Sequence, residues 1–307
     1  MPTLDSTGLG DAFVIPATQL GPITERVQSD SVLASLSPEQ PTLFGNVQAV
    51  RMTRKPRAQI VAEGANKASD TGEWDSVMAS PVKVQTTVRF TDEVKWLDED
   101  HRLGIVDALT SALGESIARA VDLIGIHGIN PIDGTKAASV TNYLDLTTKR
   151  VTAAGDEDAE LEAAVALIAG DGTYVPTGLG MDPSYAFATA TQRYTDGNLQ
   201  GQKINPDMGF GFDASSWNGL TLATSTAVSG RPEAADTGTR AIMGDFSQMK
   251  WGFLRRIPVT SIEYGDPDGG GDLQRNIQIA YRAEAVLYVA IFDLGAFAAV
   301  ETAPAGG

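Results

Sequence analysis

Residues 62–128 decide the fold and read AEGANKASDTGEWDSVMASPVKVQTTVRFTDE followed by VKWLDEDHRLGIVDALTSALGESIARAVDLIGIHG. Alternating apolar and polar residues predict strands at about 59–62 and 82–90. The 19 residues between them are rich in Gly, Ser, Asp and Asn and have no apolar face. A lone two-stranded ribbon is marginally stable in water, and its unpaired edges invite pairing with another chain. The sequence therefore predicts a ribbon that a neighbouring copy of the protein completes.

The second half of this stretch predicts one long helix from about Trp96 to Gly128. At 1.5 Å per residue, its roughly 27 residues would form a rod of about 40 Å. Gly125 and Gly128, followed by Pro131, predict its end. Apolar residues recur at spacings of three and four and form one stripe for burial: Leu103, Val106, Leu109, Leu113, Ile117, Val121 and Ile124.

The remainder of the chain predicts two shorter helices and then mostly strands. One helix opens at Asp156 and ends at Gly170, and another opens at the Asp182–Pro183 pair and runs to about Tyr194. Strands are expected at 220–224, 240–244, 253–262, 277–282 and 285–292. A ribbon, a long helix, shorter helices and then many strands indicate an α+β fold.

Composition and charge exclude several classes of protein. The chain has 307 residues, no cysteine and a formal net charge of −16. Without cysteine there is no disulfide framework, thiolate metal site or catalytic thiol. A field this acidic argues against binding nucleic acid or an anionic membrane surface. No apolar run is long enough for a transmembrane helix, and the first residues lack the pattern of a signal peptide.

The ribbon region departs from this acidic balance. Arg51, Arg54, Lys55 and Arg57 place four cations within seven residues, and residues 51–95 carry eight basic against six acidic side chains, a balance of +2. The rest of the chain then carries −18, since the total is −16. A basic ribbon on an acidic body suits an electrostatic contact between identical subunits. The alternative is a solvated strand edge protected by its charges.

Candidate chemistry is sparse. The two histidines, His101 and His127, lie near opposite ends of the predicted helix, too far apart to share a metal, and a structural role is expected for both. The segment 266–272, DPDGGGD, fails the calcium-loop pattern because Ile277 stands where a glutamate is required. The carboxylate pairs 98/100 and 156/158 allow an acidic hydrolase as an alternative, but acids are expected at helix starts without catalysis. No metal or cofactor is expected.

The ordered features resemble the major capsid proteins of tailed bacteriophages, which share the Hong Kong phage-type shell fold. Residues 62–93 are similar to that family's extended loop, and 96–128 resemble its spine helix, with HGINPIDG as the glycine-rich exit. MDPSYAFATATQRYTDGNLQ, GDFSQMKWGFLRRIPV and RAEAVLYVAIFDLGAFAAVE resemble later segments of the family in the same order. The order and spacing of these segments, which span nearly the whole chain, carry the resemblance.

The resemblance implies an architecture with an N-terminal arm, an extended β-loop, a spine helix, and peripheral and axial lobes. The implied boundaries are an arm at 1–45, the loop at 46–92 and the spine helix of the peripheral domain at 93–129. Residues 130–240 would form mainly the axial domain, and 241–307 a β-rich part shared by both domains.

The resemblance also implies a function without catalysis. Copies would self-assemble as hexamers and pentamers into an icosahedral head that encloses double-stranded DNA, in the virion, after assembly in the host cytoplasm. Expected partners are the protein itself, a portal, a separate scaffolding protein and a decoration protein. An encapsulin-type nanocompartment shell is the alternative. Expected subunit contacts are Arg51, Arg54, Lys55, Arg57, Glu63, Lys67 and Trp74.

Some members of the family join subunits covalently, which implies one further possibility. Lys67 lies in the loop, Asn276 stands near the position of the family's crosslinking asparagine, and Glu284 would be the base. Such an isopeptide bond needs a neutral lysine in a desolvated pocket. The simpler interpretation is that Glu284 pairs with an arginine such as Arg282.

Overall fold

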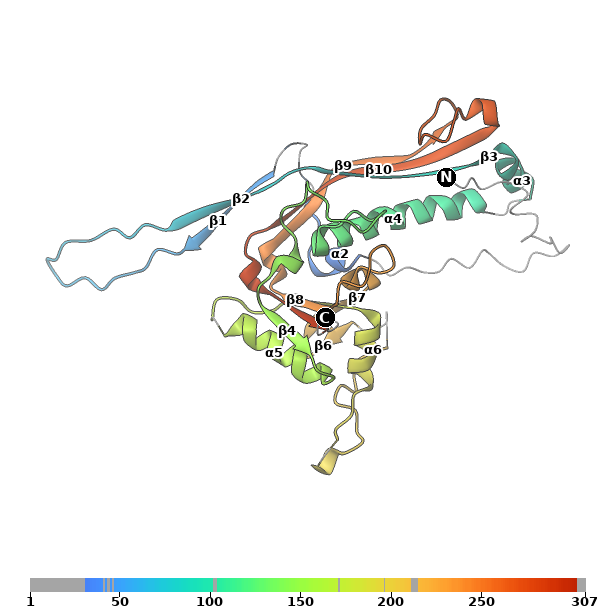
Figure 1. The fold of residues 1–307 in the computed structure, drawn as a ribbon. Coiled ribbons are helices and arrows are strands. Elements are labelled where there is room, and N and C mark those ends of the chain that lie inside the picture. Colours follow the sequence, from blue (N-terminus) through green and yellow to red (C-terminus); the bar gives the residue numbers. More distant parts are fainter. Residues whose placement is uncertain are drawn as a thin grey trace.

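A ribbon, a long sheet backed by a helix, and a lower lobe built on a second sheet make up the subunit (Figure 1). This computed structural model describes residues 31–40, 42, 45, 47–101, 104–170, 172–195, 197–210 and 215–302. Most of the expected N-terminal arm at 1–45 therefore lies outside the described residues.

The ribbon consists of β1 (Val47–Arg54) and β2 (Glu73–Ala79), paired antiparallel and projecting from the body (Figure 1). The strand predicted at 59–62 is wrong, because residues 55–62 form no regular structure and are exposed. Their short apolar run pairs with no strand in the described part of the chain, whereas β1 and β2 pair along their length.

The upper layer is a three-stranded sheet in the order β3-β10-β9, formed by β3 (Val82–Thr91), β9 (Met249–Ile262) and β10 (Gln278–Ile291). The strand predicted at 82–90 is confirmed as β3. The strands predicted at 277–282 and 285–292 are instead one continuous strand, β10. The register between β10 and β9 shifts between Arg282 and Glu284. The alternation of apolar and polar residues is therefore interrupted at this point although the strand continues.

The predicted single spine helix over 93–129 is wrong in its first part. The structure has two helices, α3 (Asp92–His101) and α4 (Ile105–His127), separated at Gly104, which adopts a left-handed conformation with φ 71°. Asp98 accepts hydrogen bonds from the backbone N–H groups of Ile105 and Val106 and so caps α4 from the preceding helix. The remaining rod, 23 residues long, spans about 35 Å and ends at Gly128 as predicted.

The lower lobe has a six-stranded sheet in the order β4-β11-β8-β5-β7-β6. Helices α5 (Glu157–Ala169) and α6 (Pro183–Thr191) bury their apolar faces in one cluster with this sheet. The predicted caps are confirmed, since Asp156 caps α5 and Asp182 caps α6. The strands are β4 (Arg150–Ala153), β5 (Gly178–Met181), β6 (Ser216–Trp217), β7 (Leu220–Thr224), β8 (Thr239–Gly244) and β11 (Phe297–Thr302). Short 3-10 turns lie at Leu144–Leu146, Gly197–Leu199, Thr226–Ser229, Phe246–Gln248, Gln274–Asn276 and Leu294–Ala296.

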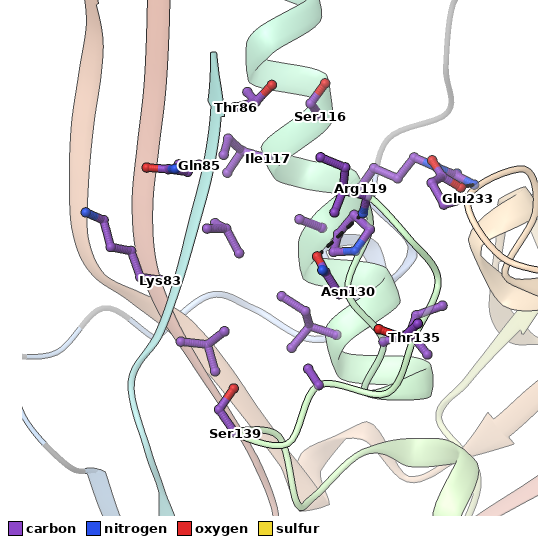
Figure 2. Close-up of a pocket in the computed structure, with 18 of the residues that line it drawn as sticks. Lys83, Gln85, Thr86, Ser116, Ile117, Arg119, Asn130, Thr135, Ser139 and Glu233 are labelled. Atoms are coloured by element: carbon purple, nitrogen blue, oxygen red, sulfur yellow. Dashed lines mark hydrogen bonds and ion pairs between the residues drawn. The ribbon is translucent and has the colours of Figure 1, made fainter. Parts of the chain in front are cut away.

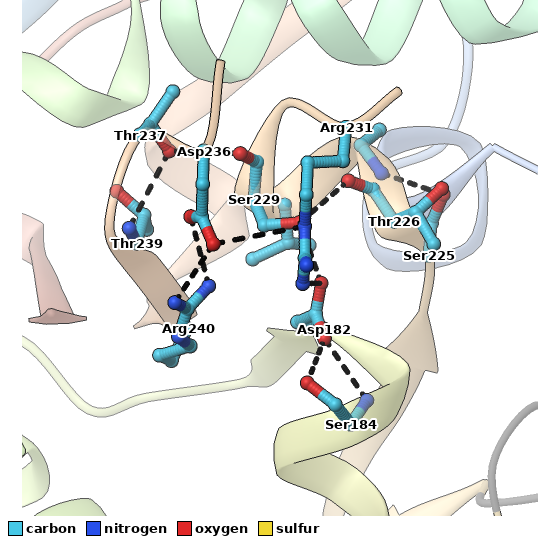
Figure 3. A network of polar contacts seen from close by, with 12 residues as sticks. Asp182, Ser184, Ser225, Thr226, Ser229, Arg231, Asp236, Thr237, Thr239 and Arg240 are labelled. Atoms are coloured by element: carbon cyan, nitrogen blue, oxygen red, sulfur yellow. Dashed lines mark hydrogen bonds and ion pairs between the residues drawn. The ribbon is translucent and has the colours of Figure 1, made fainter. Parts of the chain in front are cut away.

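A polar network in this lobe joins the start of α6 to the loop before β8 (Figure 3). Asp182 accepts hydrogen bonds from the backbone N–H of Ser184 at 2.9 Å and from the Ser229 hydroxyl at 2.5 Å. Arg231 lies 3.6 Å from Asp182 and 3.7 Å from Asp236 and so bridges the two carboxylates. Both carboxylates in Figure 3, Asp182 and Asp236, thus make hydrogen bonds and ion pairs that connect segments of the lower lobe.

The short helix α2 (Val32–Leu36) packs between α4 and the strands β5 and β7 of the lower sheet. Val32 and Leu33 are buried and pack where Gly180 on β5 and Gly125 on α4 have no side chain. A Cβ at either glycine would overlap the leucine or valine, so close approach requires glycine at both positions. One small helix therefore contacts both the spine helix and the lower sheet.

A fully buried carboxylate ties α2 to α4. Asp122 accepts hydrogen bonds from the Ser31 hydroxyl at 2.5 Å and from the backbone N–H groups of Val32 and Leu33 at 2.9 and 3.0 Å. Burial raises the pKa of Asp122 to about 6, although these hydrogen bonds and the charge of Arg119 favour the ionised form.

This raised pKa predicts that Asp122 contributes more to the stability of the folded chain at pH 5 than at pH 7.5. The folded pKa lies above the usual value of 3.8, so the folded state binds the proton more tightly and stability falls as pH rises through about 6. Between pH 5 and pH 7.5 this group is expected to change the free energy of unfolding by roughly 1 kcal/mol. Urea unfolding of wild type and of Asp122→Asn at both pH values measures it. An equal pH dependence in the two proteins would contradict the assignment.

Candidate subunit interface

The two faces of the ribbon differ in chemistry. Residues paired directly across an antiparallel ladder point to the same face. Met52 pairs with Trp74 and Gln48 with Met78, which places these side chains together with Val50 on one face. We call Val50, Met52, Trp74 and Met78 the outer apolar face.

The opposite face of the ribbon is anchored on the body. Val47, Val77 and Ala79 pack against a buried cluster contributed by β9 and β10. Arg51 also lies on this face, 2.9 Å from the carboxylate of Asp293, which follows β10. The predicted contact residue Arg51 is therefore used within the subunit.

Among the residues that the structure describes, none covers the outer apolar face. Trp74 is 65% exposed and Met78 64% exposed, and Val50 and Met52 are also exposed. An exposed cluster of large apolar side chains on a projecting element is typical of a protein interaction site. Trp74 was predicted from the sequence as a contact residue and the other three were not, although the period of two in VRM and EWDSVM was a readable signal.

The ribbon's outer loop is held at its base by ion pairs. Arg54 donates to Asp70 and lies 3.0 Å from Glu73, and Arg57 donates its backbone N–H to Asp70 at 2.8 Å. The hydrogen bond from the Arg54 guanidinium holds the pKa of Asp70 below its usual range. Two of the predicted contact cations, Arg54 and Arg57, thus make their ion pairs within the loop, with Asp70. Lys55, Glu63 and Lys67 are exposed, as is every residue from 55 to 71.

The three residues of the implied crosslink are not brought together in one subunit. Lys67 lies in the outer loop, while Asn276 and Glu284 lie on the β9–β10 hairpin. Six residues of extended β10 separate Gln278 from Glu284, which is roughly 20 Å. Glu284 lies 3.6 Å from Arg282 and 3.5 Å from Lys83, so the simpler interpretation of this glutamate as an ion-pair partner agrees with its geometry.

A buried arginine that sequence analysis missed holds the end of the hairpin. Arg89 on β3 pairs with Asp266 at 3.1 Å and with Asp268, and it donates to the Gly271 carbonyl at 2.9 Å and to Gln278 at 3.2 Å. We call this set the Arg89 clasp. The segment 266–272 is thus a hairpin end whose carboxylates bind an arginine.

A cleft of about 720 Å³ lies between β3 and α4 (Figure 2). Its cations are occupied: Arg119 pairs with Glu233, Lys83 with Glu284, and Lys136 donates to the His127 carbonyl at 2.7 Å. In Figure 2 Arg119 and Glu233 lie together at one side of this cleft. The Thr135 hydroxyl, also on its lining, donates to the Asp133 carboxylate at 2.8 Å within the same turn.

The carboxylates considered for a hydrolase have structural partners. Asp98 caps α4, Asp156 caps α5, and Asp158 accepts hydrogen bonds from Asn205 and from the indole N–H of Trp217 at 3.1 Å. The side chain of Asp100 lies outside the described residues, as does that of His101. His127 is fully buried and its Nε2 lies 2.9 Å from the Val228 carbonyl, in agreement with the structural role expected for it.

No three His, Asp or Glu side chains come together as a metal-binding group in the part of the chain that the structure describes. None of the described helices is long and apolar enough to cross a bilayer. The exposed ribbon, with its outer apolar face, is the candidate functional element.

Comparison with known proteins gives a consistent result. The family model described as phage capsid protein matches residues 74–300. No curated protein matches the chain. A solved structure from Mycobacterium phage Ogopogo is 41% identical, with a TM-score of 0.83 over 95% of this chain and 98% of its own.

Two further solved structures extend the likeness. One from Gordonia phage Cozz is 27% identical, with a TM-score of 0.81 over 97% of this chain and 94% of its own. The capsid of a native GTA particle shares the fold at 14% identity, with a TM-score of 0.63 over 95% of this chain and 96% of its own.

Proposed function

The chain belongs to the phage capsid protein family, and from that premise we propose how its copies meet. It is the major capsid protein of a tailed bacteriophage, and it has the Hong Kong phage-type fold expected from the sequence. Copies self-assemble into the virion head that encloses the DNA. We propose that the ribbon makes the principal contact between neighbouring copies within hexamers and pentamers.

The outer apolar face carries this proposal. Burying Trp74 and Met78 against a neighbour would remove apolar surface from water, which favours association by about 25 cal/mol per Å². The opposite face of the ribbon packs on β9 and β10, and this packing fixes the base of the ribbon on the body of the subunit. A contact between two different patches on successive copies is the kind that closes rings and shells.

Substitution of the outer face tests the proposal. Trp74→Ser is expected to reduce assembly at least tenfold, because an aromatic anchor at an interface typically contributes 2 kcal/mol or more. Trp74→Phe, which keeps an aromatic side chain, is the matched control and should assemble. Sedimentation and negative-stain electron microscopy measure the outcome. Normal shells from Trp74→Ser would refute the role of this face.

The negative net charge of the chain supports a shell that does not bind the enclosed DNA tightly. With a net charge of −16, the subunit repels DNA at long range, so we propose that enclosure involves no sequence-specific binding. We further propose a portal, a separate scaffolding protein and a decoration protein as partners, and a purely structural role without catalysis. The alternative of an encapsulin-type shell is disfavoured by the phage capsid family match.

The proposed domains follow the implied boundaries, with the spine corrected. The arm comprises 1–45, the loop 46–92 and the axial domain mainly 130–240, while 241–307 contributes to both lobes. The 93–129 segment contains α3 and α4 rather than one helix.

We expect subunits of mature particles to run as a single band on denaturing gels. Glu284 is held by Arg282 and Lys83 and stands about 20 Å along its strand from the residues next to Asn276, so it cannot serve as the base at that amide within one subunit. Comparison of wild type with Lys67→Arg checks this prediction. A ladder that disappears in Lys67→Arg would contradict it and establish the isopeptide bond.

A further inference from the structure

The base of the ribbon contacts the body at two places along its length. The first contact is apolar: Val47 packs on the buried cluster of β9 and β10, together with Val77 and Ala79. The second is polar, because Arg51 lies 2.9 Å from the carboxylate of Asp293. The four residues of β1 from Val47 to Arg51 cover roughly 13 Å. One contact alone would let a projecting element pivot, whereas two contacts at this spacing fix its direction.

The carboxylate of Asp293 is held by donors from three segments. Arg51 comes from the ribbon, the Tyr174 hydroxyl donates at 2.7 Å from the segment before β5, and the Gly295 N–H donates at 2.8 Å. Burial opposes ionisation, but the hydrogen bonds from Tyr174 and Gly295 hold the pKa of Asp293 below its usual range. The carboxylate is therefore charged at neutral pH. We call Arg51, Asp293 and Tyr174 the base latch.

Tyr174 connects the base latch to the lower lobe. Its ring packs against two buried clusters, one shared with α4 and β10 and one within the lower lobe. Burial and the hydrogen bond to Asp293 raise the pKa of Tyr174, so its hydroxyl remains a donor at neutral pH. Arg51 and Asp293 are 23% and 32% exposed, and an ion pair of this exposure contributes little by itself. The packed tyrosine holds the carboxylate in place for the arginine.

One group in the base latch is unsatisfied. The Nε of Arg51 is buried and has no hydrogen-bond partner among the described residues. Asp75, which lies across the ladder from Arg51, accepts a hydrogen bond from the backbone N–H of Ser76 at 2.8 Å. A buried donor without a partner raises the free energy of the closed latch. Opening the latch therefore takes less free energy than its hydrogen bonds alone would require.

We propose that Tyr174 is a positioning residue for assembly: through Asp293 and Arg51 it sets the direction in which the ribbon leaves the body. Opening of the base latch lets the ribbon take another direction. Successive copies meet at different angles in a hexamer and in a pentamer, so one chain must present its ribbon in more than one direction. This inference rests on the proposed function, but it concerns the joint of the ribbon and not the surface that the ribbon touches.

Distances between two spin labels measure the direction of the ribbon, and the absence of cysteine makes the label sites specific. One label is placed at Ser76→Cys on β2 and the other at Ala163→Cys on α5, both exposed positions. Dilution with unlabelled protein restricts the measurement to distances within one subunit. In Tyr174→Phe, which loses only the hydroxyl, the population outside the main distance peak should rise roughly tenfold, because a hydrogen bond to a charged group shifts an equilibrium by about this factor.

The matched control is Tyr185→Phe. Tyr185 also donates to a carboxylate at 2.7 Å, that of Glu160, but this hydrogen bond lies within the lower lobe. Its loss should leave the ribbon distances unchanged, which separates positioning from a general loss of stability. Arg51→Gln should broaden the distances as Tyr174→Phe does, and Arg51→Lys, which keeps the charge, should retain most of the main peak.

The outcomes separate this inference from the function that it rests on. Identical distances in wild type and Tyr174→Phe would overturn the proposal, and so would equal broadening in Tyr174→Phe and Tyr185→Phe. Tyr174→Phe decides even if Arg51→Gln does not fold. These distances are measured within single subunits, so they decide the role of the latch whether or not shells form. A wild-type protein that forms no shells would refute the proposed function instead.

Discussion

Replacement of residues 55–72 by Asn-Gly is expected to give a stable, folded subunit that no longer forms shells. Arg54 pairs directly with Glu73, so a two-residue turn can join β1 to β2 without changing their register. Residues 55–71 are all exposed and contribute nothing to the core. Shortening the loop should raise the free energy of unfolding by about 2 kcal/mol through loop entropy.

The control for this variant keeps the length of the loop but removes its side chains. An 18-residue Gly/Ser segment in place of 55–72 preserves the length while removing Ile60, Arg57 and Lys67. Both variants should unfold cooperatively in urea, and both should sediment as unassembled subunits. Shells from the Gly/Ser variant would show that length alone is needed, and shells from the Asn-Gly variant would exclude the outer loop from assembly altogether.

Arg89→Ala is expected to destabilise the subunit by about 3 kcal/mol, because removing one partner of a buried ion pair leaves the other charge uncompensated. The Arg89 side chain is only 5% exposed, and Asp268, its partner, is largely buried too. Lys83→Ala is the matched control on the same strand. Its ion pair with Glu284 involves a lysine side chain that is 60% exposed, so it should cost less than about 1 kcal/mol.

Urea unfolding of the two variants measures this contrast. Hydrogen exchange adds a local readout, since release of the clasp should deprotect the connection at 263–277 while leaving α5 unchanged. Equal stability of the two variants would show that the clasp contributes no more than a surface ion pair.

Local signals in the sequence predicted the starts of both helices of the lower lobe and two strands of its sheet, β7 and β8. Asp156 and Asp182 predicted the starts of α5 and α6 because a side-chain cap acts within its own turn of helix. The strand predicted at 220–224 is β7, Leu220–Thr224. These features depend on residues close together in the chain.

The errors arose where distant residues decide the structure. The apolar stripe from Val106 to Ile124 continues through Leu103, so periodicity alone could not reveal the break at Gly104, where Asp98 caps a new helix. The Arg89 clasp joins residues 177 to 189 positions apart. No spacing rule connects an arginine in one strand with a glycine-rich segment so far along the chain.

The candidate interface was predicted in its location but only partly in its residues. Clustered cations drew attention to the ribbon, yet Arg51, Arg54 and Arg57 make ion pairs within the subunit. The exposed apolar residues carry the proposed contact instead. The inner face of the ribbon is buried against β9 and β10, whereas the outer face is exposed. This difference depends on strands more than 170 residues further along the chain, so the local sequence could not predict it.

The order of strands in both sheets has a consequence for synthesis on the ribosome. β10 lies between β3 and β9, and β11 lies between β4 and β8, although both strands are made after their partners. A nascent chain can thus display its ribbon early while neither sheet is complete. A chain that ends before β10 lacks the strand on which the inner face of the ribbon packs, so we expect such products to hold their ribbon less firmly than the full chain does.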